Sequence, residues 1–273
     1  GYATPSGQPD VELFLGELHG KMEFLKQLNQ IAFEDILSSR KIKKESSLSR
    51  PTKTDGLVIK NRRLYFANTV AILQKPDLLL KIFLESGRTK TPLSIEAMRV
   101  VSEFCHLVDD QARTDPQWVK LFKRTLALSY WEFNVLNVML STGILERFIP
   151  EFSAIVNKIQ YNHYHLFPVD KHSMRCVQEI NSFKEPGTTQ MNTLYAGVFK
   201  DIRNKNVLLV AALLHDIGKS DPAKEHSKRG VKIAGPILDR LGFNPTERED
   251  VLFLIQHHLL DWSAISMAAI IGL

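Results

Sequence analysis

The sequence predicts a mainly α-helical protein that contains one small β-hairpin. Over much of the chain, apolar residues recur three or four positions apart, and Gly and Pro separate the segments that show this spacing. A β-favouring pattern stands out around residues 57–66. Hydrophobic residues make up 44% of the 273 residues, which is enough to bury a substantial core.

The first half of the chain predicts a tail, a long helix, the hairpin and several shorter helices. Residues 1–14 are expected to form a flexible tail, and the apolar spacing from Leu15 to Leu37 predicts an amphipathic helix. Two β-favouring runs at 57–59 and 64–66 flank a polar stretch and predict the hairpin. Further helices are expected at Pro76–Glu85 (ended by Gly87), at Ser94–Leu107, and as a pair between Gln117 and Leu140 (ended by Gly143). We therefore expect a helical domain over residues 15–160.

The composition argues against nucleic-acid-binding and membrane-spanning classes of protein. The net charge of +5 and the pI near 9.1 come largely from a polar basic segment at residues 40–53, which we interpret as a solvated loop, so a nucleic-acid partner is not expected. The longest apolar run has eight residues, far below the roughly 20 that a membrane helix needs. A cytoplasmic protein is expected. Cys105 and Cys176 are far apart in the sequence and are each interpreted as small buried hydrophobes.

Residues 161–273 are expected to form a second domain, in which polar side chains occupy inward positions of predicted helices. Asp170 is expected to cap a helix that carries His172 on its inner face. The apolar helix Val207–Leu214 ends directly at His215 and Asp216, and Lys219 follows three residues later. Two metal-ligand residue types therefore stand together at the end of a buried helix.

Two later helices add further imidazoles. His226 begins the inner line of a helix that ends at Gly242. Asn244 and Glu247 have the spacing of a capping box, and the helix they begin carries His258 on its inner line, with His257 on the side shared with Phe253. Any one of these histidines alone would be a core or helix-end residue more often than a ligand. Five of the nine histidines lie at such positions on four successive helices, which favours a metal centre.

Imidazole and carboxylate ligands suit Mn or Mg, with Fe, Co or Zn as alternatives. Such an ion lowers the pKa of bound water and neutralises charge on a phosphoryl oxygen, so hydrolysis of a phosphate ester is predicted. Lys219 has two interpretations, as a contact to a phosphate oxygen or as a partner of the helix dipole. His163 and His165 have the spacing of ligands, but we favour packing or substrate contact for them.

The order His, His-Asp, His-Ser-x-x-Gly, His-His, Asp resembles the HD phosphohydrolase superfamily, whose metal centre lies in a helical bundle. Within that superfamily the chain most resembles the bifunctional uridylyltransferase/uridylyl-removing enzymes that act on the PII nitrogen-signalling protein. The stretches that carry this resemblance are 145–152, 164–172, 211–219 and 257–260. The resemblance covers roughly residues 15–260 and implies an HD domain preceded by linker helices.

The resemblance also assigns site residues. It implies that His172, His215, Asp216 and Asp261 hold the principal ion, and that His226 with His257 or His258 holds a second ion or orients the phosphate. In the family a loop and a helix separate His-His-Leu-Leu from the last Asp, whereas here Asp261 follows Leu260 at once. The family's transferase half carries an Asp-x-Asp, which this sequence lacks. We therefore expect no transferase activity in these residues.

The predicted reaction is hydrolysis of a UMP–tyrosine phosphodiester on a PII-like signalling protein. One alternative is hydrolysis of a free nucleotide, including guanosine tetraphosphate, because the superfamily shares its metal centre across substrates. Another is a non-catalytic helical regulatory module that keeps the fold without turnover.

Overall fold

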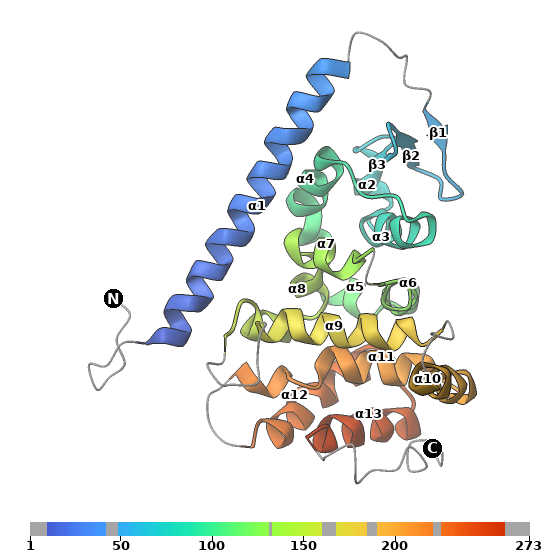
Figure 1. The fold of residues 1–273 in the computed structure, drawn as a ribbon. Coiled ribbons are helices and arrows are strands. Elements are labelled where there is room, and N and C mark those ends of the chain that lie inside the picture. The colour runs from blue at the N-terminus through green and yellow to red at the C-terminus, as the bar shows by residue number, and fades with distance from the viewer. Residues whose placement is uncertain are drawn as a thin grey trace.

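The computed structural model describes residues 10–41, 49–130, 133–159, 168–184, 190–220 and 225–259. Within these residues the protein is built mainly of helices, with one small sheet near one end (Figure 1). The predicted mainly α fold is confirmed.

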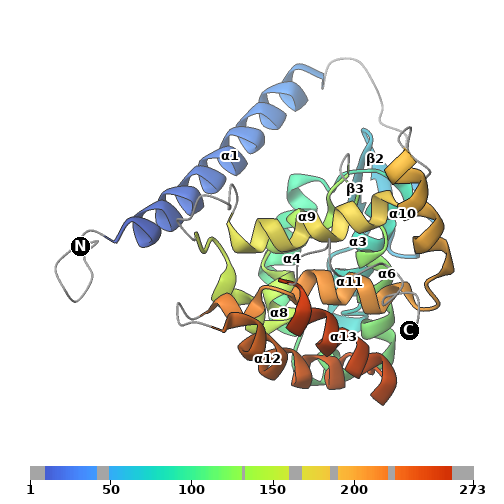
Figure 2. The ribbon, with the colours of Figure 1, turned by 60° about the horizontal axis from the view of Figure 1, so that its bottom comes forward.

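The first helix, α1 (Val11–Lys41), stands apart from the rest of the molecule along most of its length (Figures 1 and 2). It begins inside the segment expected to be a tail and continues past the predicted end at Leu37. Its contact with the body depends on small residues, because a Cβ atom on Gly16 would lie 2.8 Å from the carbonyl oxygen of Asn157. Several of its apolar side chains are exposed, among them Met22 and Leu25.

The predicted hairpin is present and is joined by a third strand. Strands β2 (Leu57–Lys60) and β3 (Arg63–Phe66) pair antiparallel, and β1 (Arg50–Pro51) pairs with β2. Asn61 and Arg62 form the connection with φ angles of 48° and 61°, which match the right-handed twist of a tight hairpin. Strand β1 was not predicted, because two residues are too few to show an alternating pattern.

A group of short helices packs beside this sheet. It consists of α2 (Ala71–Gln74), α3 (Leu78–Thr89), α4 (Ile95–Phe104), α5 (Asp110–Thr114), α6 (Pro116–Leu126), α7 (Val135–Ser141) and α8 (Ile144–Phe148), with 3-10 helices η1 (Cys105–Leu107) and η2 (Pro150–Ile155). The predicted end of a helix at Gly87 is wrong: α3 continues to Thr89, and Lys90 takes the left-handed conformation. Gly87 instead permits close packing, because a Cβ there would lie 2.8 Å from Cβ of Leu128.

The second half of the chain forms a bundle around one apolar helix. This bundle contains α9 (Val169–Ser182), α10 (Gln190–Asp201), α11 (Lys205–Leu214), η3 (Ile217–Ser220), α12 (His226–Arg240) and α13 (Pro245–His257). Helix α11 packs against both α9 and α13 (Figure 1), and its residues 209–214 are all buried. A helix that is apolar on all sides is suited to this central position. None of the helices in the described ranges is long and apolar enough to span a membrane.

Polar contacts join the bundle to the helices before it. Arg240 at the end of α12 donates two hydrogen bonds, each 2.8 Å long, to the carboxylate of Glu151 in η2. Lys158 Nζ donates to the carbonyl oxygen of Ser220 in η3 at 2.8 Å. The Lys158 contact lies in the turn that follows His215 and Asp216, and the Arg240 contact holds the far end of α12.

Candidate metal centre

Helix α9 carries His172, one turn from its start. The predicted cap at Asp170 is wrong, because the helix begins at Val169 and Pro168 takes the capping position. Asp170 therefore lies in the first turn, where it is buried, and burial raises the pKa of its carboxyl group. The side chain of His172 is 39% exposed, so solvent reaches this part of the site.

The end of α11 supplies the residues at the centre of the cluster. His215 follows the last residue of α11, and its Nδ1 lies 2.8 Å from the carbonyl oxygen of Ala212. Because a carbonyl only accepts, Nδ1 carries the proton and donates this bond. Nε2 of His215 faces the neighbouring carboxylate and lies 3.2 Å from Oδ2 of Asp216.

Helices α12 and α13 bring two more imidazoles to the same carboxylate. Nε2 of His226, the first residue of α12, lies 3.7 Å from Oδ1 of Asp216. Nε2 of His258, just after α13, lies 3.4 Å from the same oxygen and 3.4 Å from Nε2 of His226. His258 is oriented as His215 is, since its Nδ1 lies 2.6 Å from the carbonyl oxygen of Ile255.

The close approach of α12 requires a glycine in η3. A Cβ atom on Gly218 would lie 1.9 Å from the carbonyl oxygen of His226 and 2.5 Å from the backbone nitrogen of Gly230. No side chain fits at these separations. Arg229 reinforces the contact by donating a 2.8 Å hydrogen bond to the carbonyl oxygen of Gly218. Gly218 thus sets the distance between His226 and Asp216.

Lys219 pairs with the central carboxylate. Its Nζ donates a hydrogen bond of 2.8 Å to Oδ2 of Asp216, and the residue is only 4% exposed. In this arrangement the ammonium group lies against Asp216 and is covered from solvent. Lys219 therefore supports Asp216 directly. The contact to a phosphate oxygen that we considered from the sequence stays a prediction.

The electrostatics of the cluster favour an ionised carboxylate. Burial alone would raise the pKa of Asp216, but its interactions with His215 and His258 and the nearby positive charge of Lys219 outweigh this effect. The pKa of Asp216 therefore lies well below its usual range. Burial also lowers the pKa of His226, which keeps that imidazole neutral and able to donate a lone pair.

A divalent cation fits this arrangement. Nδ1 of His215 and of His258 already donates to a carbonyl, so Nε2 of each neutral ring carries a lone pair. This lone pair faces a carboxylate oxygen, which is favourable only if the ring gains a second proton or a cation lies between the two atoms. Oδ1 of Asp216 is buried and has no hydrogen bond among the described residues. Asp216, His226 and His258 form one group whose ligand atoms all lie within 4.8 Å of one another.

A second group of the same kind includes a cysteine that sequence reasoning missed. The ligand atoms of His172, Cys176 and His215 also lie within 4.8 Å of one another. Cys176 is half-buried, as is Cys105, so neither is the buried hydrophobe that the sequence predicts. Burial raises the pKa of the Cys176 thiol to about 11. The spacing of four residues from His172 on one helix was the signal that could have revealed it.

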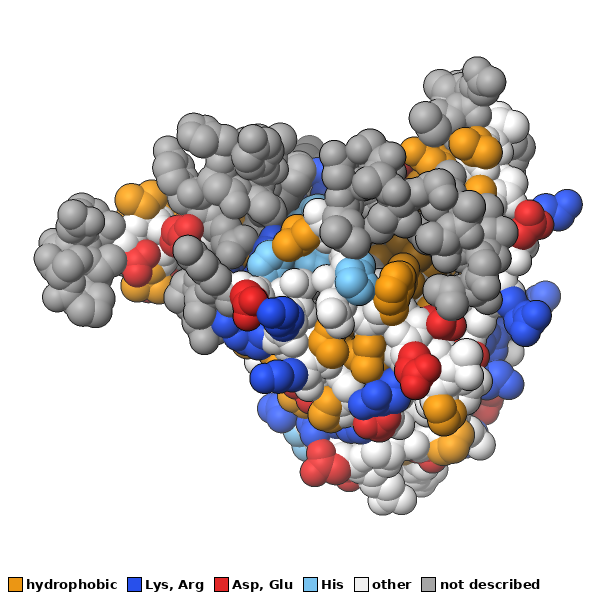
Figure 3. All heavy atoms as spheres, turned by 90° about the horizontal axis from the view of Figure 1, so that it is seen from below, with side chains coloured by type: hydrophobic (Ala, Val, Ile, Leu, Met, Phe, Trp, Pro, Cys, Tyr) orange, Lys and Arg blue, Asp and Glu red, His pale blue; other side chains and the backbone are white. Residues whose placement is uncertain are grey.

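The remaining predicted site residues are placed differently. The ring of His257 lies against Phe253, with centroids 4.5 Å apart, and is not part of either group. Asp261, His163 and His165 lie outside the described residues. Seen from below, histidine side chains reach the surface of the bundle, with Lys and Arg side chains to one side of them (Figure 3).

Comparisons with known proteins agree with this geometry. Residues 169–271 match the HD domain, and residues 57–148 match the third domain of uridylyltransferase GlnD. Residues 169–271 are therefore an HD domain. The HD domain contains His172, His215, Asp216, His226 and His258, and the other match covers the small sheet and the helices up to α8.

Full-length relatives extend the similarity through both parts of the chain. The bifunctional uridylyltransferase/uridylyl-removing enzyme of Ruegeria pomeroyi is 31% identical over 265 residues, which are 95% of this chain and 29% of that protein. Enzymes of the same name from Bradyrhizobium sp. BTAi1 and Rhodopseudomonas palustris are 29% and 30% identical over the same share of the chain. The chain therefore spans less than a third of the length of these relatives.

Proposed function

We propose that the HD domain is a divalent-metal-dependent phosphodiesterase that removes UMP from a tyrosine of a PII-like signalling protein in the cytoplasm. The observation that carries the proposal is the convergence of four imidazole Nε2 atoms on the one buried carboxylate of Asp216, at 3.2 to 3.9 Å. The relatives named as uridylyl-removing enzymes support this choice of reaction.

We assign His172, His215 and Asp216 to the principal ion, and His226 with His258 to a second ion or to the phosphate. A bound Mn²⁺ or Mg²⁺ would supply Lewis acidity toward the phosphoryl oxygens and a nucleophile at neutral pH. His215 and His258 keep their Nε2 lone pairs directed at the centre through their Nδ1 hydrogen bonds. Lys219 holds the Asp216 carboxylate and balances its charge before substrate arrives.

His258 is preferred over His257 as the ligand from the His-His pair, because only His258 lies beside Asp216. Asp261 stays a proposed ligand, by resemblance to the family. An Asp261→Asn variant tests that role directly, with a loss of metal affinity expected.

The experiment is release of UMP from a uridylylated PII protein in the presence of Mn²⁺ or Mg²⁺. His215→Ala and Asp216→Asn are expected to lose more activity than the roughly 10- to 100-fold that removal of a ligand's supporting partner costs. His257→Ala is the matched control, since it removes the neighbouring imidazole on the same helix and should keep activity. UMP release that survives in the His215 and Asp216 variants would refute the assignment.

A panel of free nucleotides, including guanosine tetraphosphate, gives the substrate class. Faster turnover of a free nucleotide than of the UMP–protein conjugate would show that the domain is a nucleotide hydrolase of the same superfamily instead. Loss of both activities in Asp216→Asn would still be expected, because the metal centre is the same in either case.

A further inference from the structure

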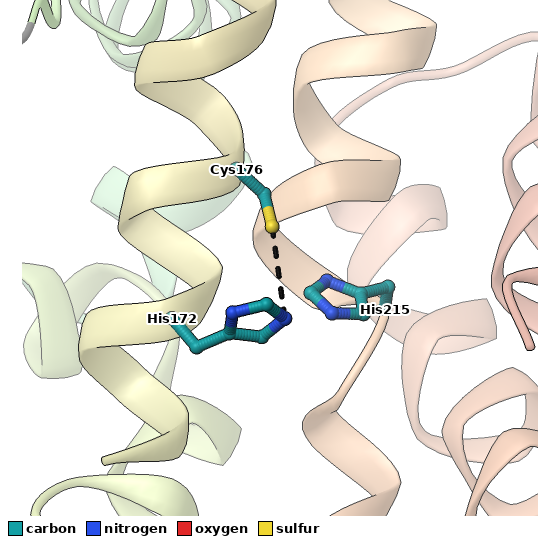
Figure 4. A group of neighbouring side chains, drawn as sticks. All are labelled: His172, Cys176 and His215. Atoms are coloured by element: carbon teal, nitrogen blue, oxygen red, sulfur yellow. Dashed lines mark hydrogen bonds between the residues drawn. The ribbon is translucent and has the colours of Figure 1, made fainter. Parts of the chain in front are cut away.

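The group formed by His172, Cys176 and His215 combines nitrogen and sulfur donors at one edge of the centre. Cys176 and His172 lie one turn apart on α9, and His215 follows α11 on the facing side (Figure 4). The ring of His172 lies edge-on to that of His215, with centroids 5.1 Å apart. Both histidines also approach Asp216, so they are shared between this group and the centre described above.

The distance between the ligand atoms of Cys176 and His172 matches that of two ligands in a tetrahedral thiolate site. With metal–sulfur and metal–nitrogen bonds of about 2.3 and 2.0–2.1 Å, two ligands at a tetrahedral angle are separated by about 3.5 Å. Sγ of Cys176 lies 3.7 Å from Nε2 of His172. The Nδ1 bond of His215 to Ala212 leaves Nε2 of that ring as its lone-pair donor. One ion can therefore be reached by all three side chains with small rotations.

Sulfur changes which ion is preferred. Oxygen-rich sites suit Mg²⁺ and Mn²⁺, whereas a thiolate with two imidazoles suits Zn²⁺. We propose that His172, Cys176 and His215 form a Zn²⁺-selective subsite whose occupancy excludes the ion needed for hydrolysis, because both ions require the same two histidines. On binding, the sulfur–hydrogen bond breaks, the sulfur–zinc bond forms, and the proton passes to solvent without any change of oxidation state.

Only the inhibitory consequence rests on the proposed function; the binding itself does not. The binding test uses the complete 273-residue chain with Co²⁺ as a spectroscopic substitute for Zn²⁺. We expect a sulfur-to-cobalt charge-transfer band in the near ultraviolet, abolished by added Zn²⁺. The band should persist in Cys105→Ser and vanish in Cys176→Ser. A wild-type protein without the band, or a Cys176→Ser variant that retains it, would overturn the proposal.

A second readout does not depend on the folding of a Cys176 variant. In Cys105→Ser, Cys176 is the only thiol of the chain, so its rate of alkylation by a maleimide can be followed alone. We expect Zn²⁺ to slow this rate at least about tenfold and excess Mg²⁺ to leave it unchanged, since Mg²⁺ avoids sulfur ligands. Equal rates with and without Zn²⁺ would contradict the subsite, whether or not the chain hydrolyses any phosphodiester.

The proposed subsite predicts that loss of Cys176 weakens inhibition of hydrolysis by Zn²⁺. Zn²⁺ should inhibit UMP release supported by Mn²⁺ in the wild type and in Cys105→Ser, and inhibition of Cys176→Ser should need at least about tenfold more Zn²⁺. Equal inhibition of all three proteins would show that Zn²⁺ acts elsewhere. Absence of hydrolysis in every protein would refute the proposed function while leaving the cobalt and alkylation results to decide the subsite.

Discussion

At the scale of single residues, the centre depends on backbone contacts that orient side chains. His215 and His258 each use Nδ1 to donate to a carbonyl three residues earlier, which fixes the ring and directs Nε2 at Asp216. The sequence could predict His215, Asp216 and His226 from their inward positions. The inner line contained His258, but the resemblance left open which of His257 and His258 is the ligand, because it matches the pair as a whole.

The residue type alone did not predict the role of a side chain that can have two roles. Cys176 was interpreted as a small hydrophobe, and its place beside His172 and His215 follows from the packing of α9 against α11. Lys219 was predicted to face a phosphate or the helix dipole. Its burial against Asp216 arises from the tight turn of η3, which a dipeptide motif does not reveal.

Gly218 gives a prediction at this scale. Gly218→Ala should destabilise the protein by at least about 2 kcal/mol, because the new Cβ would overlap the backbone of His226 and force α12 away. Urea unfolding measures the change. Gly197→Ala is the matched control, because Gly197 lies in α10 and a new Cβ there would have no atom within 4 Å. This substitution should stabilise the protein by about 0.5–1 kcal/mol, because alanine favours the helix over glycine. Equal unfolding curves for the two variants would contradict the role of Gly218.

At the scale of elements, the position of α12 depends on its contact with η2. Arg240 and Glu151 form a two-bond ion pair whose side chains are 25% and 30% exposed. Burial alone would raise the pKa of Glu151, but the hydrogen bonds and charge of Arg240 outweigh it, so the pKa lies below its ordinary value. The pair therefore stabilises the fold only while Glu151 is ionised.

The corresponding prediction concerns pH. Glu151→Gln should lower the free energy of unfolding by about 1 kcal/mol at neutral pH, a modest value because solvent screens the pair. Since the folded pKa is depressed, this stabilisation is complete above the unfolded value near 4.5 and is lost as pH falls through the folded value. Urea unfolding at neutral and acidic pH measures it. Asp55→Asn, which breaks the exposed pair with Lys75, should have almost no effect at either pH. A constant difference for Glu151→Gln at all pH values would disprove the linkage.

Most elements could be predicted from local pattern, and the errors have local causes. The hairpin and the capping box of α13 were predicted correctly, because turn chemistry and cap spacing are encoded over a few residues. The sequence predicts a helix end at Gly87, whereas Gly87 permits close contact with Leu128, which lies far along the chain. The residue type of Asp170 suits a cap, but Pro168 takes the capping position and the helix begins at Val169.

At the scale of the whole molecule, the candidate metal centre joins four parts of the bundle. Its ligands come from α9, the turn after α11, the start of α12 and the residue after α13. Bound ions would therefore add bonds between four segments that already meet through packing and the hydrogen bond from Arg229 to Gly218. An ion that binds only the folded state raises the free energy of unfolding by RT ln(1 + [L]/Kd), where [L] is the free ion concentration.

Metal binding should therefore raise the melting temperature. At a Mn²⁺ concentration of 100 times Kd, we expect the free energy of unfolding to increase by about 2.7 kcal/mol. Calorimetric scans across a Mn²⁺ titration measure it. His257→Ala should respond as the wild type does, and Asp216→Asn should show no increase. A melting temperature that rises equally in Asp216→Asn would place the stabilising ion elsewhere.

The most direct test of the central claim is a crystal structure of the Mn²⁺-loaded protein with anomalous data collected at the manganese edge. We expect an anomalous peak beside the Asp216 carboxylate, within bonding distance of imidazole nitrogens from His172 and His215. A folded, Mn²⁺-saturated protein with no peak there, or with its manganese bound away from Asp216, would contradict it.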